Sequence, residues 1–477
     1  MSNHTTAVPK TLEEILRGFT TCFTAPGSKN FAILIVGWIV CQTRHSISRV
    51  IQASGEIDAG DKHHSRFYRF LSSGRWTIDS VGHVLFQLLT RLLPEEITLI
   101  IDDTLCHKNG PHLFGGAMHY DSHQSTYGRG SAKGRQSFFA FGHNWVVAAL
   151  WLPCPWNTVR GIAVPFLFRL YRSKKYCPKK DYRKRTDLAL DLIKLIASWL
   201  PEDRKLHLVA DAEYACKTIV RNLPDRVAFT GPMSMKAALY DEPKARKGRG
   251  RPAKRGKRLP SPEKLAASGS TPWKKKKLKI YGKTVTILVK SMDCLWYTVA
   301  GTHRVRMVVT RDPSGRLNDR AYFTTDTKLT VEELLAQFAR RWEIEVSFRN
   351  TKQSLGIQDP QNGWWRRAKG TPRPKKRPGP NPRGRIGEDA INHTLAMAFA
   401  THAIVVLWYW RHGKPEKDVA AARAAAPWYR KKIAPSFSDM LAAVRREIWT
   451  ERFSRNPIIE GGRRKIRNLL PHWLLAA

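Results

Sequence analysis

Three acidic residues occupy positions at which a fold commonly presents catalytic groups. Asp102 ends the apolar run ITLIID, Asp211 ends the run KLHLVAD, and Glu345 lies in the stretch RRWEIEVSFRNTKQSLG at 340–356. Ligands and catalytic groups of α/β proteins gather at the carboxyl ends of strands. A carboxylate that follows a buried run is costly unless a cation pairs with it. Taken singly, each aspartate could simply cap a helix.

Taken together, the three carboxylates predict a divalent-cation site that acts on phosphates. Hard oxygen ligands suit Mg²⁺ or Mn²⁺. Two such ions can activate a nucleophile and stabilise the leaving oxygen of an in-line phosphoryl transfer. Asp103 is an alternative to Asp102. Because successive side chains of a strand point to opposite faces, only one of these two aspartates can face the site.

A single helix predicted over 330–355 must position the glutamate. At about 100° per residue, Glu343 falls about 160° from Glu345, on the opposite face, where we expect it to be solvated. The face of Glu345 carries two cations and three apolar residues, namely Arg341, Lys352, Leu334, Phe338 and Phe348. Glu345 is therefore the glutamate predicted to do chemistry, with a plain i, i+4 ion pair to Arg341 as the alternative.

The charge of the chain indicates its partner. The 477 residues include 82 Lys and Arg against 39 Asp and Glu, a net charge of +43. Nucleic acid is the polyanion that best offsets such self-repulsion, and a generic solubility charge is the alternative. The apolar run at 395–410 contains Thr401 and His402 and is shorter than a membrane span, so it predicts a buried helix.

The cysteines and the start of the chain bear on the compartment. Seven scattered cysteines without a CxxC or Cys/His cluster indicate neither a disulfide framework nor a zinc site. The N-terminus lacks the pattern of a secretory signal. We therefore expect a cytoplasmic, nucleoid-associated protein that does not bind membranes.

The pattern of apolar residues predicts an α/β core with a β-rich insertion, flanked by helical regions. Strands are expected at 97–102, 143–153, 161–171, 205–211 and 226–231, with a helix at 186–200 between them. Alternating runs at 278–291, 294–301 and 303–312 predict the insertion. The expected regions are 1–95 (helical, DNA-binding), 96–232 (core, first part), 233–325 (basic loop and insertion), 326–412 (core, second part, with a basic Pro-rich loop) and 413–477 (helical and basic).

Several basic segments are candidates for DNA contact. The stretch 63–76 interleaves Arg66 and Arg69 with aromatic residues, although a core helix with solvated arginines would look the same. The segment 244–258 has nine basic residues in fifteen, and together with KKKK at 274–277 it predicts a mobile basic loop. Its RGRP core, with Arg249 and Arg251, is similar to an AT-hook, and generic phosphate contact is the alternative.

The helix also carries a signature. The chain resembles bacterial insertion-sequence DDE transposases of the IS-four type, whose helix has Tyr, Arg, Glu and Lys separated by two, three and six residues. Here the four positions are Phe338, Arg341, Glu345 and Lys352. The contexts IDDT and VADAEY resemble those of the first two catalytic acids. The family motif places its acid two residues before the threonine, which selects Asp102 over Asp103. The resemblance covers about residues 60–360.

The resemblance implies an RNase H-like catalytic core and a chemistry. Asp102, Asp211 and Glu345 would hold Mg²⁺, or Mn²⁺, as two ions, and Arg341 and Lys352 would bind backbone phosphates. The enzyme would cut transposon terminal repeats through a hairpin intermediate and join them to target DNA, as a homodimer. A flipped base could stack on Trp273 or Trp296. Phe338 lacks the hydroxyl of the family tyrosine. The alternatives are a nuclease or resolvase of the same fold, and a non-catalytic DNA-binding descendant.

Overall fold

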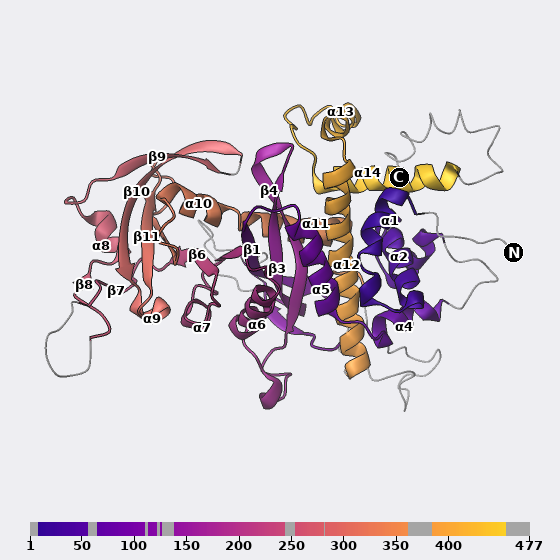
Figure 1. Cartoon of the computed structure of the whole chain (residues 1–477), viewed down its shortest axis with the longest axis horizontal. Coiled ribbons are helices and arrows are strands. Elements are labelled where there is room, and N and C mark those ends of the chain that lie inside the picture. The colour runs from indigo at the N-terminus through magenta and orange to yellow at the C-terminus, as the bar shows by residue number, and fades with distance from the viewer. Residues whose placement is uncertain are drawn as a thin grey trace.

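The computed structural model describes residues 8–55, 64–109, 113–121, 125, 138–243, 253–280, 282–360 and 384–454. Arg249 and Arg251 lie outside these residues, as do most of the predicted basic loop and nearly all of the basic Pro-rich loop. Over the described residues the chain is a mixed α/β protein built on one large sheet with helices on both sides (Figure 1).

Five strands form the part of the sheet that carries the acids. They are β1 (Glu96–His107), β3 (Phe139–Cys154), β4 (Asn157–Tyr171), β5 (Lys205–Ala210) and β6 (Val227–Met233). Their spatial order is β4-β3-β1-β5-β6, antiparallel on the β3–β4 side of β1 and parallel on the β5–β6 side. The five predicted core strands are therefore present. The first is longer than predicted, so Asp102 lies inside β1 rather than at its end.

The β-rich insertion continues the same sheet. Strand β12 (Arg320–Thr324) pairs with β6, then come β11 (Arg304–Arg311), β10 (Lys283–Leu295) and β9 (Lys274–Ile280). Shorter strands are β2 (Ala117–Tyr120), which pairs with β3, and β7 (Leu239–Tyr240) and β8 (Arg258–Leu259) beyond β10. The sheet has twelve strands in all.

Two groups of helices flank the sheet. The N-terminal group is α1 (Lys10–Arg17), α2 (Ala25–Val40), α3 (Ile47–Ser54), α4 (Ser65–Ser73) and α5 (Ile78–Thr90). The C-terminal group is α12 (Arg385–His412), α13 (Pro415–Ala425) and α14 (Phe437–Ser454). Inside the core region lie α6 (Arg185–Ser198), α7 (Lys217–Val220), α8 (Pro262–Ala267), α9 (Tyr297–Ala300), α10 (Val331–Ala339) and α11 (Trp342–Ser354).

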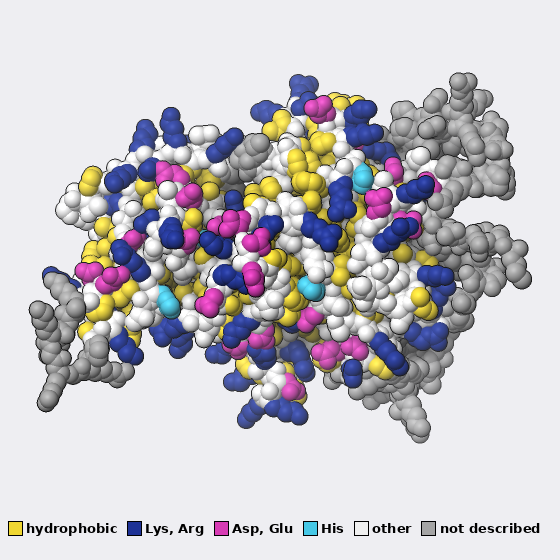
Figure 2. Space-filling model, viewed as in Figure 1, with side chains coloured by type: hydrophobic (Ala, Val, Ile, Leu, Met, Phe, Trp, Pro, Cys, Tyr) yellow, Lys and Arg dark blue, Asp and Glu magenta, His cyan; other side chains and the backbone are white. Residues whose placement is uncertain are grey.

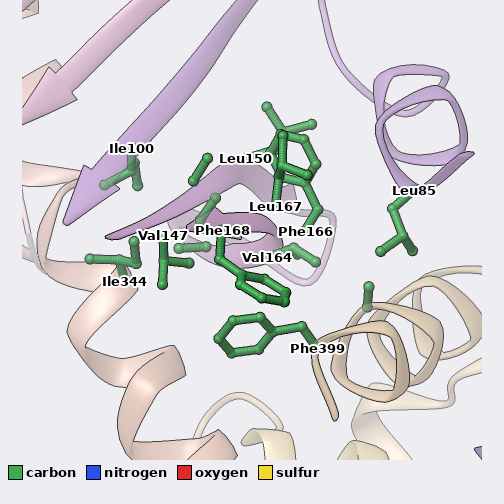
Figure 3. Close-up of a cluster of buried hydrophobic side chains, with 14 of the residues drawn as sticks. Leu85, Ile100, Val147, Leu150, Val164, Phe166, Leu167, Phe168, Ile344 and Phe399 are labelled. Atoms are coloured by element: carbon green, nitrogen blue, oxygen red, sulfur yellow. The ribbon is translucent and has the colours of Figure 1, made fainter. Parts of the chain in front are cut away.

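Helix α12 joins the two groups to the sheet. It packs against α4, α2 and α14 on one side and against β4 on the other (Figure 1). Among the described residues it is the one helix long and apolar enough to span a membrane, yet 94% of its apolar window is buried inside the protein. In the core beside it, the Phe168 and Phe399 rings meet edge to face with centroids 5.6 Å apart (Figure 3). The prediction of a buried helix over 395–410 is therefore confirmed.

Two predictions about the insertion were wrong. KKKK at 274–277 is not a loop but the start of β9, in register with β10. Strand β9 has a neighbour on one side only, and an edge strand tolerates lysines because its outer face stays in water. The predicted strand over 294–301 ends at Leu295, and α9 follows. Trp296 there is buried against Phe323, so this apolar run serves the core rather than the sheet.

The predicted helix over 330–355 is also broken. Helix α10 ends at Ala339 and α11 begins at Trp342. Across the break, the N–H groups of Arg340, Arg341, Glu343 and Ile344 each donate to the carbonyl three residues earlier. Such a turn is wound more tightly than an α-helix. Positions predicted on the assumption of a uniform 3.6-residue repeat are therefore shifted beyond the break.

Candidate active site

The pairing of β1 with β5 brings the first two acids together. The two strands are parallel, with Ile101 opposite Ala210, and each aspartate is the next residue of its chain. Along β1, residues 102, 104 and 106 are buried while 103, 105 and 107 are half-buried. Asp102 and Asp103 thus point to opposite faces, as strand geometry requires. The buried face is the one that α11 contacts.

Asp102 is a buried carboxylate with two donors. Its Oδ1 accepts the backbone N–H of Asp103 at 2.8 Å, and its Oδ2 accepts Nη1 of Arg341 at 2.7 Å. Burial raises the pKa of Asp102 to about 7, Arg341 opposes that rise, and the nearby Asp211 and Asp103 add to it. The carboxylate is therefore costly to ionise where it lies, which is typical of residues at functional sites.

Glu345 contacts the same guanidinium, and Asp211 lies near it. Nη2 of Arg341 donates to Oε1 of Glu345 at 2.8 Å. Asp211 Oδ1 accepts the backbone N–H of Glu213 at 2.9 Å, and burial raises the pKa of Asp211, with Arg341 among the groups that oppose the rise. Burial alone would lower the pKa of Arg341, but Asp102 and Glu345 outweigh that effect and raise it. Arg341 thus forms ion pairs with Asp102 and Glu345, whereas Asp211 interacts with it only electrostatically and, among the described residues, forms no ion pair with it.

The other face of β1 carries a second cluster that sequence reasoning missed. Asp103 accepts Nη1 of Arg185 at 3.1 Å and Nδ2 of Asn144 at 2.8 Å on Oδ2, and the hydroxyl of Tyr214 at 3.4 Å on Oδ1. Nη2 of Arg185 also contacts Glu213 at 2.7 Å. Asn144 lies in β3, the strand that pairs with β1. The contact therefore depends on the pairing of these two strands, which no local motif predicts.

Two further sets of contacts hold the ends of α11 in place, and neither was predicted from the sequence. At its start, Arg340 donates to Thr98 Oγ1 on β1 at 2.6 Å and stacks on Trp151 at 4.1 Å. Beyond its end, Lys108 Nζ donates to the carbonyls of Ile357, Gln358 and Pro360 at 2.8–3.2 Å. Burial lowers the pKa of Lys108 to about 8. These contacts fix the helix that carries Arg341 and Glu345.

The prediction that Glu343 is solvated was wrong. Helix α11 packs on β4 as well as on β1, and the neighbouring Ser347 is buried with its hydroxyl on the Ala163 carbonyl. Glu343 is half-buried on this side, where burial raises its pKa and Arg160 opposes the rise. The prediction that it faces away from the other acids is unaffected, because its neighbours are Arg160 and Cys154.

The predicted DNA-binding residues fall in two places. Lys352 lies on α11 near Cys106 of β1, so Arg341, Glu345 and Lys352 follow one face of the helix along the buried face of β1. Arg66 and Arg69 lie on α4, which Figure 1 shows on the far side of α12 from β1. Arg66 is half-buried over the Phe67 ring, and Arg69 is exposed.

Neither predicted stacking tryptophan is open for a base. Trp296 is buried in the insertion, with its ring 5.0 Å from that of Phe323. Trp273 is half-buried, with Lys290 Nζ 4.6 Å and the Arg311 guanidinium carbon 4.3 Å from the centroid of its ring. A base that stacked on a ring face covered by these cations would have to displace them.

The donor set suits a hard divalent cation, although the carboxylates do not form a finished cage. Asp102, Asp211 and Glu345 supply the oxygen ligands that Mg²⁺ and Mn²⁺ prefer. A cation, the Arg341 guanidinium, already lies among them. Within the described part of the chain, no group of three or more His, Cys, Asp or Glu side chains is close enough to hold a metal ion.

Comparison with known families explains this arrangement. The sequence model described as "DDE superfamily endonuclease" matches residues 18–287, more than half of the chain and a span that includes Asp102 and Asp211. The chain belongs to the DDE superfamily. A second model, described as "Archaeal putative transposase ISC1217", matches residues 297–372, which include Glu345. The predicted transposase class is thus confirmed at the level of the DDE superfamily, whose members are DNA transposases and endonucleases that use divalent metal ions.

The chain was also compared with solved structures and with curated proteins. A solved piggyBac transposase synaptic complex with hairpin DNA matches at 11% sequence identity, over 97% of this chain and 81% of that one, with a TM-score of 0.36. A search of the curated proteins found no match.

Proposed function

We propose that this DDE-superfamily chain is a transposase of the IS-four type that cuts transposon ends and joins them to target DNA. Its core would be RNase H-like, in keeping with the strand order β4-β3-β1-β5-β6. The observation that carries the proposal is the arrangement of the acids: Arg341 bridges Asp102 on β1 and Glu345 on α11, and the parallel register of β1 and β5 places Asp211 beside Asp102. The helix signature supports the IS-four assignment, with Phe338 as its one departure.

Asp102, Asp211 and Glu345 would hold Mg²⁺ or Mn²⁺, as two ions. When bound, these ions supply charge stabilisation for an in-line phosphoryl transfer. The chain's own residues supply the geometry. The parallel register of β1 and β5 sets the spacing of the aspartates, and the contacts of Arg340 and Lys108 hold α11 against them.

The reaction would comprise successive phosphoryl transfers at this one site. Water would attack a phosphate at the transposon end and release a 3′-OH. That hydroxyl would attack the opposite strand to form a hairpin. Hydrolysis of the hairpin would free an end that joins target DNA. Arg341 and Lys352, which share the acid-bearing face of α11, would bind the backbone phosphates. A homodimer holding both terminal repeats would couple the two ends.

A second basic surface supports DNA binding away from the acids. Lys275, Lys277 and Lys279 alternate along one face of β9 and are exposed. Figure 2 shows Lys and Arg side chains over the edge of the molecule where β9 lies. Among the described residues these three lysines form no salt bridge, whereas Lys276 on the other face pairs with Glu332. Like charges on a two-residue period repel one another unless an anion lies across them, and a DNA backbone is such an anion.

The test uses a duplex with the inverted repeats that flank the gene. With Mg²⁺ or Mn²⁺ the protein should nick the repeat end, form a hairpin and join it to a plasmid. In EDTA it should do none of these, and in Ca²⁺ it should bind without cutting. Nicking without strand transfer would reduce the function to a nuclease. Binding without nicking in any metal would make the chain a DNA-binding descendant.

A further inference from the structure

Arg341 lies between two of the carboxylates that would hold a metal ion. Its guanidinium bridges Asp102 Oδ2 and Glu345 Oε1 at 2.7 and 2.8 Å. Asp102 Oδ1 already accepts the backbone N–H of Asp103. Both oxygens of Asp102 are therefore engaged. Each carboxylate oxygen keeps a further lone pair for a metal ion, but a divalent ion bound beside the Arg341 guanidinium would repel it, which favours departure of the guanidinium when the ion binds.

The side chain of Arg341 is able to leave while its backbone stays. The adjacent Arg340 is tied to Thr98 and Gln337 and stacks on Trp151, which fixes the chain at the α10–α11 break. Among the described residues, the hydrogen bonds of the Arg341 guanidinium go only to Asp102 and Glu345. Its side chain is 19% exposed, so it has access to solvent.

A phosphate is the partner for which this arginine would exchange the carboxylates. A guanidinium binds carboxylates and phosphates with the same two-pronged geometry. DNA bound along α11 would offer phosphates to Arg341 next to Lys352, the other cation of that helix face. The contacts that Arg341 gives up are then replaced rather than lost.

We propose that Arg341 is the resident cation of the acid site and that it moves to a DNA phosphate as the metal is loaded. The proposal rests on the proposed function. It makes metal binding conditional on DNA, because the free protein holds its acids closed with its own guanidinium. The coupling is reciprocal, so metal must tighten DNA binding by the factor by which DNA tightens metal binding.

The experiment is a Mn²⁺ titration of the full-length protein followed by electron paramagnetic resonance, which measures binding without activity. It is run with and without an end duplex that has a 3′-dideoxy terminus and so cannot react. For wild type, DNA should tighten Mn²⁺ binding about tenfold or more. Without DNA, Arg341→Gln should bind Mn²⁺ about as tightly as wild type does with DNA. Adding DNA should then tighten Mn²⁺ binding to this variant by less than about threefold. The control Arg349→Gln removes an exposed cation from the same helix and should behave as wild type.

The outcomes separate the two proposals. If Arg341→Gln binds Mn²⁺ no better than wild type in the absence of DNA, the exchange is wrong. If Mn²⁺ binding to wild type with DNA is insensitive to Asp102→Asn, the metal site itself is wrong. Arg341→Lys is a second variant in case Arg341→Gln misfolds. Its ammonium group keeps the positive charge beside the acids but does not bridge two carboxylates as the guanidinium does. Its affinity without DNA should lie between those of wild type and Arg341→Gln, and any other order overturns the exchange.

Discussion

The two faces of β1 carry the same motif with different surroundings. On one face Arg341 bridges Asp102 and Glu345, and on the other Arg185 bridges Asp103 and Glu213. Each cluster is an aspartate of the strand, an arginine of a helix and a glutamate. Neighbouring residues in one sequence, IDDT, therefore anchor two ion-pair networks that differ only in what else they touch.

The two aspartates differ in the number of side chains that donate hydrogen bonds to them. Asp103 has Asn144 and Tyr214 as well as its arginine, while Asp102 has one backbone N–H and Arg341. A network with several fixed donors favours one rigid arrangement, whereas a single arginine can be exchanged for another cation. On the proposed function, the better-bonded Asp103 would serve the scaffold, and the less fully bonded, more deeply buried Asp102 would serve the chemistry.

The largest expected effect separates the two aspartates by activity. Asp102→Asn should lower nicking of an end duplex by on the order of a thousandfold or more, because it removes a ligand charge that the other acids cannot replace. Asp103→Asn should keep activity in proportion to its folded fraction. Glu345→Gln should behave as Asp102→Asn, with DNA affinity unchanged or slightly raised. Nicking assays with parallel gel-shift binding decide this, and an inactive but fully folded Asp103→Asn protein would exchange the roles of the two faces.

The next largest expected effect is on stability, and here the substitution of Asp103, rather than that of Asp102, should be the damaging one. Asp103→Asn leaves Arg185 and Asn144 facing an amide and should lower the free energy of unfolding by about 2 kcal/mol, allowing for the partial exposure of Arg185. Chemical denaturation at pH 7.5 without metal measures the change. A variant as stable as wild type would mean that the Asp103 network is not structural.

A smaller effect is the pH dependence contributed by Asp102. Its folded pKa of about 7 is raised above the ordinary value of 3.8, so the folded state binds more protons than the unfolded state between these values. This acid therefore costs increasing stability as pH rises from about 4 to 7, and the cost is complete above 7. In EDTA, Asp102→Asn should be more stable than wild type at pH 8, by about 2 kcal/mol, and the gain should shrink towards pH 5. A constant difference between pH 5 and pH 8 would contradict the raised pKa.

The smallest effect concerns the glutamate beside the site. Glu343→Gln should change stability by only a few tenths of a kcal/mol and leave nicking within about threefold of wild type, since it lies towards Arg160 rather than Asp102. Thermal unfolding and the same nicking assay are sufficient. Loss of activity in this variant, with Glu345→Gln active, would reverse the assignment of the helix faces.

Local patterns located the strands and the helix that carry Asp102, Asp211 and Glu345, and the i, i+4 spacing also predicted the ion pair between Arg341 and Glu345. The apolar runs before Asp102 and Asp211 announce strands, and the spacing of Arg341, Glu345 and Lys352 announces a helix face. The contacts of Asp103 with Asn144, Arg185 and Tyr214 join segments far apart in the sequence, and no local pattern encodes them.

Two errors have definite physical causes. The prediction that Glu343 is solvated was wrong because α11 packs on β4 as well as on β1, so the side of the helix opposite Glu345 is also covered. KKKK at 274–277 was predicted as a loop because composition outweighed register, although these four lysines extend the pairing of β9 with β10.

The most direct test of the account is the position of a bound metal ion. Crystals of the protein with an unreactive end duplex would be grown in Mn²⁺, and the ion located by its anomalous scattering. The account predicts that every Mn²⁺ peak in the core lies on the α11 side of β1, ligated by Asp102 together with Asp211 or Glu345, with Arg341 turned to a phosphate. A peak ligated by Asp103 and Glu213, on the α6 side of β1, would contradict it.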